Sequence, residues 1–178
     1  MDTSSGVDLQ DYKIEKSFVQ RIALHLGIFT RRSRAALVAY GANSFVVFGF
    51  GGYNSNSEFV RRLNNASMFG GARRVDRALD TAAALMLSAR STIPKVVVLI
   101  MAGRQTSIPG AMSIQDASRP LRRLGVWLYV MAIGDSNPSD LQKATIRPTD
   151  AFFARSFSGL YGYIAPVARH IANTSGKM

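Results

Sequence analysis

The sequence contains no cysteine, and this absence removes several classes of site together. Disulfide frameworks, thiolate zinc sites, iron–sulfur clusters and cysteine nucleophiles all require that residue. Histidine is almost as scarce: only His25 and His170 occur, each alone on a predicted helix and neither in an HExxH pattern. We expect both to be structural or surface residues. The lack of cysteine does not fix the compartment, because a domain of this size can fold without bridges.

Long hydrophobic runs are also missing. The longest runs, such as residues 96–102, are about seven residues and far shorter than the roughly 20 that a membrane-spanning helix needs, so the sequence predicts no such helix. The N-terminus reads MDTSS, without a basic stretch followed by an apolar one, and no signal peptide is visible. At this point two interpretations are open: the protein is cytosolic, or the given sequence has lost its true beginning.

Acidic residues are few, which leaves a large excess of positive charge. The chain has 22 Lys and Arg against 11 Asp and Glu, a net charge of +11 at pH 7. Most of the excess is arginine, whose guanidinium forms paired hydrogen bonds with carboxylate, phosphate and sulfate, so we expect an acidic partner. The 178 residues, 47% of them hydrophobic, suit one domain with a substantial core.

Apolar periodicity divides the chain into alternating strands and helices. Helices are predicted at residues 8–26, 58–63, 75–86, 114–124, 139–144 and 159–172. Strands are predicted at residues 34–40, 44–50, 95–101, 126–133 and 151–154, and the first two are close enough to form an antiparallel hairpin. This order indicates an α/β domain with a mainly parallel sheet and one antiparallel edge strand.

Signatures of enzymes are absent. The serines lack a GxSxG elbow, no Walker pattern occurs, and residues 49–54 (GFGGYN) lack the third glycine of a dinucleotide-binding fingerprint. No pair of nucleophile and base can be named. We predict that the protein is not an enzyme.

The informative residues lie in three loops at predicted strand ends, where open α/β sheets bind ligands. They are residues 2–7 (DTSSGV), 70–79 (GGARRVDRAL) and 100–104 (IMAGR). In this order, and with these helices between them, the segments resemble the von Willebrand factor type A (VWA) domain, and the resemblance covers the whole chain, residues 1–178. It implies a single Rossmann-like, doubly wound domain with helices on both faces of the sheet.

The resemblance also implies a metal-ion-dependent adhesion site, in which an Asp-x-Ser-x-Ser loop, a threonine and a second aspartate hold a divalent cation. Asp2 and Ser4 match the first two positions. The other three positions fall on Gly6, Arg73 and Ala102, which offer no side-chain oxygen. A hard cation needs about six oxygens. We therefore expect a vestigial site without magnesium or any other cofactor.

Two interpretations of the arginines at this site are open. In the first, Arg73 pairs with Asp2 and fills the place of the metal through a charge-assisted hydrogen bond, with Arg104 as a second candidate for the same role. In the second, Arg73 and Arg104 point into solvent and Asp2 only caps the first helix. The two differ in whether a guanidinium is buried against Asp2.

The first strand of the VWA family has no counterpart in the sequence. In the family it is an apolar run in the middle of the sheet, immediately before the Asp-x-Ser motif, whereas here the motif begins at residue 2. Without that strand, the strands at 34–40 and 95–101 would each have an unpaired edge inside the core. We expect a chain truncated at its N-terminus, whose missing part held the strand and a secretion signal. The alternative is a genuine protein with rearranged strand pairing.

Arginines are the predicted ligand-binding residues, near the implied binding edge and along one side of the helix at 114–124. They are Arg73, Arg74, Arg104, Arg119, Arg122 and Arg123. For each cluster the alternative is an ordinary solvated face. Glycosylation patterns begin at Asn65 and Asn173 and favour secretion only weakly.

Together these features predict a non-enzymatic adhesion or interaction module that is extracellular. The predicted partner is a matrix protein or an anionic polysaccharide, bound through arginines and without a metal. The alternative is a basic nucleic-acid-binding α/β domain, which only the charge supports, since aromatic residues are not interleaved with the arginines.

Overall fold

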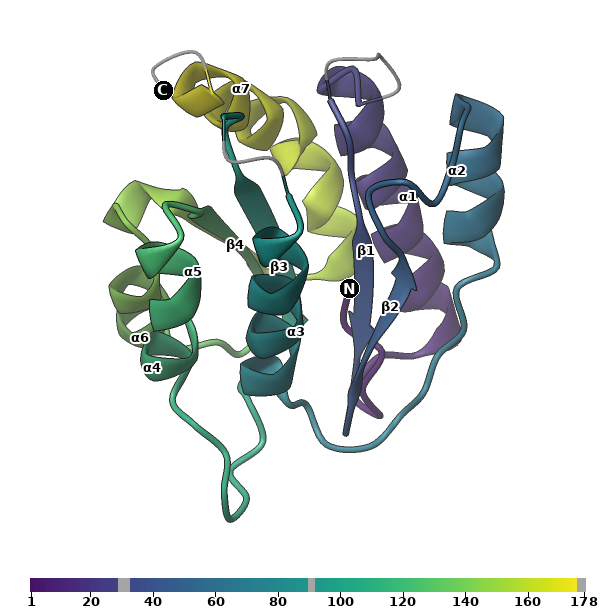
Figure 1. Cartoon of the computed structure of the whole chain (residues 1–178). Coiled ribbons are helices and arrows are strands. Elements are labelled where there is room, and N and C mark those ends of the chain that lie inside the picture. Colours follow the sequence, from purple (N-terminus) through teal and green to yellow (C-terminus); the bar gives the residue numbers. More distant parts are fainter. Residues whose placement is uncertain (29–32, 90–91, 176–178) are drawn as a thin grey trace.

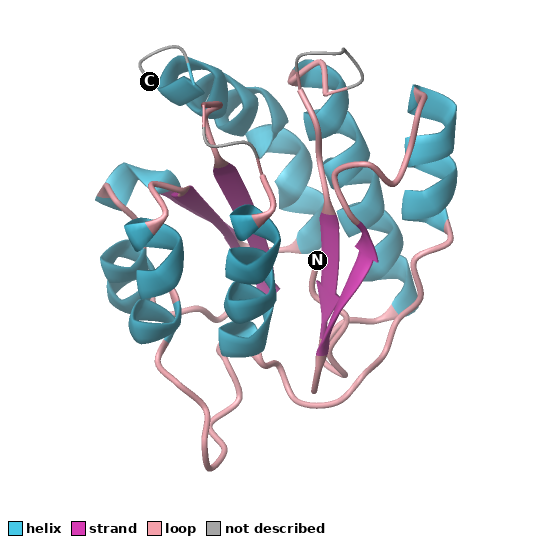
Figure 2. Cartoon of the chain, in the orientation of Figure 1, coloured by secondary structure: helices cyan, strands magenta, loops and turns pink. Residues whose placement is uncertain are grey.

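The computed structural model describes residues 1–28, 33–89 and 92–175. Within these residues the strands form two groups (Figures 1 and 2). The strands β3 (Val96–Ala102), β4 (Trp127–Ile133) and β5 (Ala151–Ala154) form a parallel sheet in that order. The strands β1 (Leu37–Tyr40) and β2 (Ser44–Phe48) form an antiparallel hairpin. The predicted hairpin and the three predicted parallel strands are confirmed.

Helices lie on both faces of the strands, with α3 to α6 on one face and α1, α2 and α7 on the other (Figure 1). They are α1 (Leu9–His25), α2 (Asn56–Asn64), α3 (Val75–Leu87), α4 (Ile114–Ala117), α5 (Arg119–Arg123), α6 (Pro138–Ala144) and α7 (Ile164–Ser175). The fold is therefore α/β and Rossmann-like, as predicted.

Strand β4 separates two hydrophobic cores, because successive side chains of a strand point to opposite faces. Tyr129, Met131 and Ile133 pack on the side of α1 and α7. The alternate residues Leu128, Val130 and Ala132 pack on the side of α3 to α6. Burial on both faces explains why every residue of β4 is apolar.

The start of α1 follows from its capping residue. The Asp11 N–H donates to Oδ1 of Asp8 at 2.8 Å, which satisfies one of the free donors at the helix N-terminus. The apolar positions Tyr12, Phe18 and Ile22 are buried. Tyr12 and Ile22 follow helical spacing and are buried, whereas Leu9, at the start of the same pattern, is 64% exposed.

Two helix predictions were wrong in detail. The single helix expected at 114–124 is two short helices, α4 and α5, and Pro120, which has no N–H to donate, lies in the first turn of α5, where a missing donor costs least. The helix expected from residue 159 begins only at Ile164. A 3₁₀ segment, Phe157–Tyr163, precedes it and contains two glycines, which disfavour an α-helix.

Strands β1 and β3 are not paired with each other in the described part of the chain. Residues 1–3 lie beside the end of β1 instead. The Tyr40 N–H donates to the Met1 carbonyl at 3.1 Å, and the Thr3 N–H donates to the Tyr40 carbonyl at 2.7 Å. This short parallel contact places Asp2 at the end of the sheet where the parallel strands finish. None of the described helices combines the length and apolarity that crossing a membrane requires.

Candidate functional site

The three loops singled out in the sequence meet at this end of the sheet. The Ser5 N–H donates to the Gly71 carbonyl at 3.0 Å, and the Gly71 N–H donates back to Oγ of Ser5 at 2.7 Å. The Thr106 N–H, just beyond the third loop, donates to the Arg73 carbonyl at 3.0 Å. The first loop is thus joined to the second, and the second to the third.

Asp2 is the fully buried acid at the centre of these loops. Its Oδ1 accepts a hydrogen bond from the Ser4 N–H at 3.0 Å. Its Oδ2 accepts from Nε of Arg73 at 2.6 Å and from the Ala102 N–H at 2.9 Å. The Asp2 N–H donates to Oε1 of Glu15 at 2.8 Å. Asp2 therefore does not cap α1; Asp8 does.

The Arg73 guanidinium is held on two sides and its side chain is only 12% exposed. Besides the bond from Nε to Asp2, its Nη1 donates to the Arg104 carbonyl at 3.1 Å. The backbone N–H of Arg73 donates to Oγ1 of Thr106 at 2.9 Å, which fixes the start of the side chain. Among the described residues, Nη2 has no acceptor.

Two glycines make room for this guanidinium. A Cβ atom on Gly6 would lie 2.6 Å from Nη2 of Arg73, and one on Gly103 would lie 3.3 Å from Nη1. Gly103 also has a φ of +95°, a backbone conformation that side chains disfavour. The Arg73 guanidinium therefore fits in this position only because residue 6 has no side chain. The sequence had shown them only as two separate departures from the metal-site pattern.

The residues present do not fit the divalent cation that the resemblance implies. Nε of Arg73 lies against Oδ2 of Asp2 at 2.6 Å, and Gly6 and Ala102 supply no oxygen from a side chain. Besides Asp2, the metal-site pattern is matched only by Ser4, whose buried Oγ has no hydrogen-bond partner among the described residues. The described residues also hold no cluster of three His, Cys, Asp or Glu side chains.

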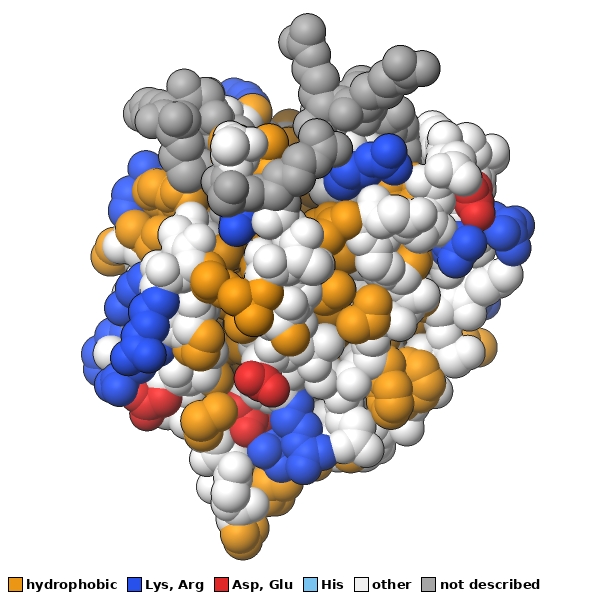
Figure 3. Space-filling model, viewed as in Figure 1, with side chains coloured by type: hydrophobic (Ala, Val, Ile, Leu, Met, Phe, Trp, Pro, Cys, Tyr) orange, Lys and Arg blue, Asp and Glu red, His pale blue; other side chains and the backbone are white. Residues whose placement is uncertain are grey.

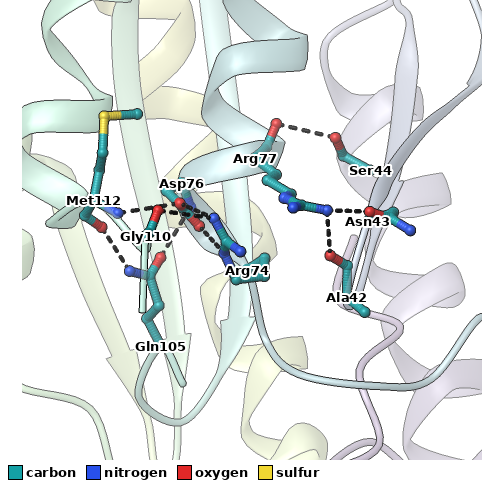
Figure 4. Close-up of polar contacts among 9 residues, drawn as sticks. All are labelled: Ala42, Asn43, Ser44, Arg74, Asp76, Arg77, Gln105, Gly110 and Met112. Carbon is teal, nitrogen blue, oxygen red and sulfur yellow. Dashed lines mark hydrogen bonds and ion pairs between the residues drawn. The ribbon is translucent and has the colours of Figure 1, made fainter. Parts of the chain in front are cut away.

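Arg74, a predicted ligand-binding residue, is turned inward instead (Figure 4). Its Nε and Nη2 donate to the two carboxylate oxygens of Asp76 at 2.8 and 2.7 Å. Burial alone would raise the pKa of Asp76, but the bonds from Arg74 and from the Met112 N–H hold it below its ordinary value. Gln105 joins the same network by accepting from the Asp76 N–H and donating to the Met112 carbonyl. Arg74 thus fastens the 103–113 loop to α3 and is not exposed to a ligand.

The remaining predicted arginines lie at the surface. Arg104 is 66% exposed and pairs with the exposed Asp135 at 3.2 Å. On α5, Arg119 pairs with Asp116 at 2.8 Å, and Nη2 of Arg122 donates to the Lys143 carbonyl at 3.3 Å. Figure 3 shows Lys and Arg side chains gathered on this side, over α5 and α6. These helices belong to the layer that covers one face of the sheet.

Glu15 is an acidic residue that the sequence analysis missed. It is fully buried on α1, and burial raises the pKa of its carboxyl to about 8, although the nearby N-terminal ammonium group acts in the opposite direction. A signal was present, because Glu15 lies three residues after Tyr12 and three before Phe18, on the apolar side of the helix. Its Oε2 has no hydrogen-bond partner among the described residues.

A model of the von Willebrand factor type A domain matches residues 1–163. The chain belongs to this family. This VWA chain is 23% identical over 180 residues to the human collagen alpha-6(VI) chain, covering 98% of this chain and 8% of that one. It is 28% identical over 145 residues to von Willebrand factor A domain-containing protein 2 of Xenopus laevis, covering 79% of this chain and 18% of that one. The VWA chain thus spans a small part of these relatives.

A solved structure shares the fold. Proximal thread matrix protein 1 from the mussel byssus has a TM-score of 0.84 and 21% identity, with 96% of the VWA chain and 44% of that chain covered. A second structure of that protein, described as having a zinc-occupied MIDAS motif, has a TM-score of 0.84, 18% identity and coverages of 94% and 45%. At these identities the likeness concerns the fold alone, and the resemblance first seen in the loops is confirmed.

Proposed function

We propose that this VWA domain is a non-enzymatic interaction module of the extracellular matrix that binds an acidic side chain of a matrix protein through Arg73 and without a metal ion. The observation that carries the proposal is the guanidinium fixed against Asp2, with Nη2 left without an acceptor among the described residues. A guanidinium has five donors, so one that neutralises Asp2 can still bond to an incoming carboxylate.

The surroundings of Arg73 favour one small anionic group. Gly6 and Gly103 flank the guanidinium without side chains, and the rest of Arg73 is buried. Arg104 adds a second positive charge nearby, and its pair with Asp135 is exposed and therefore weak enough to be exchanged for a ligand. A carboxylate matches this arrangement, because it is small and prefers charge-assisted donors.

The relatives support the matrix setting. One is a collagen chain and another is a thread matrix protein by name. The zinc-occupied motif is a property of the mussel protein. In this chain we propose that the guanidinium of Arg73 supplies the positive charge that attracts an acidic partner.

Anionic polysaccharide is a second candidate partner, and its proposed binding surface is formed by the arginines of α5 and not by Arg73. The observation that favours it is the group of exposed basic side chains over α5 and α6 (Figure 3). Arg119 is 63% exposed, so its pair with Asp116 can yield to a sulfate. The net charge of +11 would strengthen attraction to any polyanion.

Binding to immobilised matrix proteins, in EDTA and in magnesium, tests the first proposal. We expect equal binding in both, and a strong loss for Gly6→Ala, which places a methyl group against Nη2 of Arg73. Gly51→Ala is the matched control, since a Cβ atom there meets nothing within 4 Å. Binding that requires magnesium, or that survives Gly6→Ala unchanged, would overturn the proposal.

Retention on heparin and on duplex DNA across salt tests the second candidate. We expect heparin to bind more tightly than DNA, and the triple change of Arg119, Arg122 and Arg123 to Ala to reduce the salt slope of heparin binding. If heparin and DNA were retained equally, and equally by the triple variant, the overall positive charge of the chain would explain the binding without a specific site on α5. Tighter binding of DNA would favour the nucleic-acid alternative.

A further inference from the structure

Among the described residues, the outer edge of strand β2 is unpaired. In Figure 1, β1 lies between β2 and β3, so the far side of β2 faces away from the rest of the sheet. Residues 44–48 read SFVVF, without a charge or a proline, and Phe45 and Val46 are 43% and 46% exposed. Hydrophobic side chains gather beside β2 in Figure 3. Natural edge strands are usually protected by lysine, proline or a bulge. In β2 the register shifts at Val47, which has no opposed residue in β1, but residues 44–46 carry neither a charge nor a proline.

The hydrogen bonds of β1 show which way its backbone groups point. Tyr40 uses both its N–H and its carbonyl to bond to residues 1–3. The carbonyl of Val38 accepts from the Met1 ammonium group at 2.9 Å. At these two positions the backbone of β1 is therefore turned away from β2.

The orientation of β2 follows from this pattern. In an antiparallel pair, opposed residues alternate between those that exchange hydrogen bonds and those that do not. Val46 lies opposite Val38 and Ser44 lies opposite Tyr40, so both belong to the second kind. The N–H and carbonyl groups of Val46 and Ser44 point outward, whereas those of Phe45 bond within the hairpin. Outside the hairpin, no described residue bonds to the backbone of β2.

We propose that this edge binds a second copy of the chain by antiparallel pairing of the two β2 strands, centred on Val46 of each copy. A strand paired with itself about a two-fold axis places Val46 opposite Val46, and each N–H donates to the carbonyl of the other. Phe45 of one copy then faces the Val47 position of the second copy, where the register of the hairpin shifts. The segment is uncharged, so no like charges oppose each other at the contact.

The charge of the whole chain sets the salt dependence of this dimer. Two copies of net charge +11 repel each other, and salt screens that repulsion. The paired strands contribute uncharged hydrogen bonds and apolar contacts, which screening does not weaken. Association is therefore weak at low salt and becomes tighter as salt is added, the opposite of what binding to a polyanion shows.

Sedimentation equilibrium from about 10 μM to about 1 mM chain tests the dimer, a range that covers weak association. We expect the mass to rise from 19.4 kDa toward twice that value, more steeply at higher salt. Val46→Pro removes an outward N–H without breaking the hairpin and should weaken association at least about tenfold. Leu24→Gln is the control, because Leu24 is 47% exposed on α1 and the change leaves the net charge at +11, so this variant should associate like the parent.

Amide exchange on the parent protein gives a second measurement that needs no variant. The Val46 amide should exchange rapidly in dilute protein and become protected as concentration rises, while the Phe45 amide is protected throughout. A monomer across the whole range would overturn the proposal. So would a dimer that Val46→Pro leaves intact or in which the Val46 amide stays unprotected, since copies would then associate through another surface.

Discussion

Nε of Arg73 donates to Oδ2 of Asp2 at 2.6 Å, although the two residues are 71 positions apart in the sequence. The carboxylate is fully buried and the arginine nearly so. Because Asp2 also accepts from the Ala102 N–H, one carboxylate links the N-terminal segment to the loop before α3 and to the end of β3. This ion pair holds together the edge at which the VWA chain is proposed to bind its partner.

Arg73→Ala should destabilise the protein by about 3 kcal/mol, because it leaves the Asp2 carboxylate buried without its counter-charge. Urea unfolding of parent and variant measures the difference. Arg104→Ala is the control, since that arginine and its partner Asp135 are both exposed, and it should change the free energy of unfolding little. Similar small losses in both variants would show that the buried pair contributes little.

Gly6→Ala should destabilise the parent by about 1 kcal/mol, because the new methyl group must displace a guanidinium held by Asp2. Gly6→Ala should lower the free energy of unfolding much less in the Arg73→Ala background, because the guanidinium that the methyl group would displace is then absent. A double-mutant cycle in urea should therefore give a coupling of at least about 0.5 kcal/mol. Additive effects would mean that Gly6 serves some purpose other than room for Arg73.

Much of this arrangement could be predicted from the sequence, because it depends on local patterns. The two strands at 34–40 and 44–50 were predicted to form a hairpin from residue type and spacing, and the hairpin of β1 and β2 is present. The position of Arg73 followed from counting along the loop before α3. What the sequence left open was whether Arg73 reached Asp2, since that contact joins loops far apart in the chain.

Other contacts had no local pattern to reveal them. Arg74 stood beside Arg73 and was assigned the same role, but it is buried by a bidentate pair with Asp76. Residues two apart do not face each other along a regular helix, so helical spacing gave no hint of that pair. Gln105 and Met112, which complete the network, come from a loop whose path depends on tertiary contacts.

Restoring oxygen ligands should create a metal site where Arg73 now lies. We expect the triple variant Gly6→Ser, Arg73→Thr and Ala102→Asp to bind magnesium or manganese in calorimetry, because it removes the guanidinium and adds a second carboxylate. The parent should bind neither ion more tightly than about 100 μM, a weak affinity for a cation site in proteins.

The variant with only Gly6→Ser and Ala102→Asp is the control for this experiment. It carries the added oxygens but keeps Arg73 against Asp2, and it should bind no metal. Tight binding by the parent, lost in Asp2→Ala, would contradict the assignment of this place to a guanidinium. Binding by the control equal to that of the triple variant would show that Arg73 does not compete with a cation.

Glu15 should make the stability of the protein depend on pH. Burial raises the pKa of its carboxyl to about 8 in the folded chain, so between its ordinary value and pH 8 the folded state keeps a proton that the unfolded state releases. Stability contributed by this proton is present at low pH and is lost as pH rises through that window, with a slope of at most about 1.4 kcal/mol per pH unit. Glu15→Gln removes the titration and keeps an oxygen to accept from the Asp2 N–H.

Urea unfolding at pH 5, 6, 7 and 8 measures this effect, with about 1 kcal/mol per unit easily resolved. The parent should lose stability relative to Glu15→Gln at each step upward. Glu58→Gln is the control, because the N–H of Asn54 and the side chain of Arg62 lower the pKa of that glutamate, which therefore titrates below this pH range and should leave the profile parallel to that of the parent. Parallel pH profiles for the parent and Glu15→Gln would mean that Glu15 is ionised in the folded protein at neutral pH.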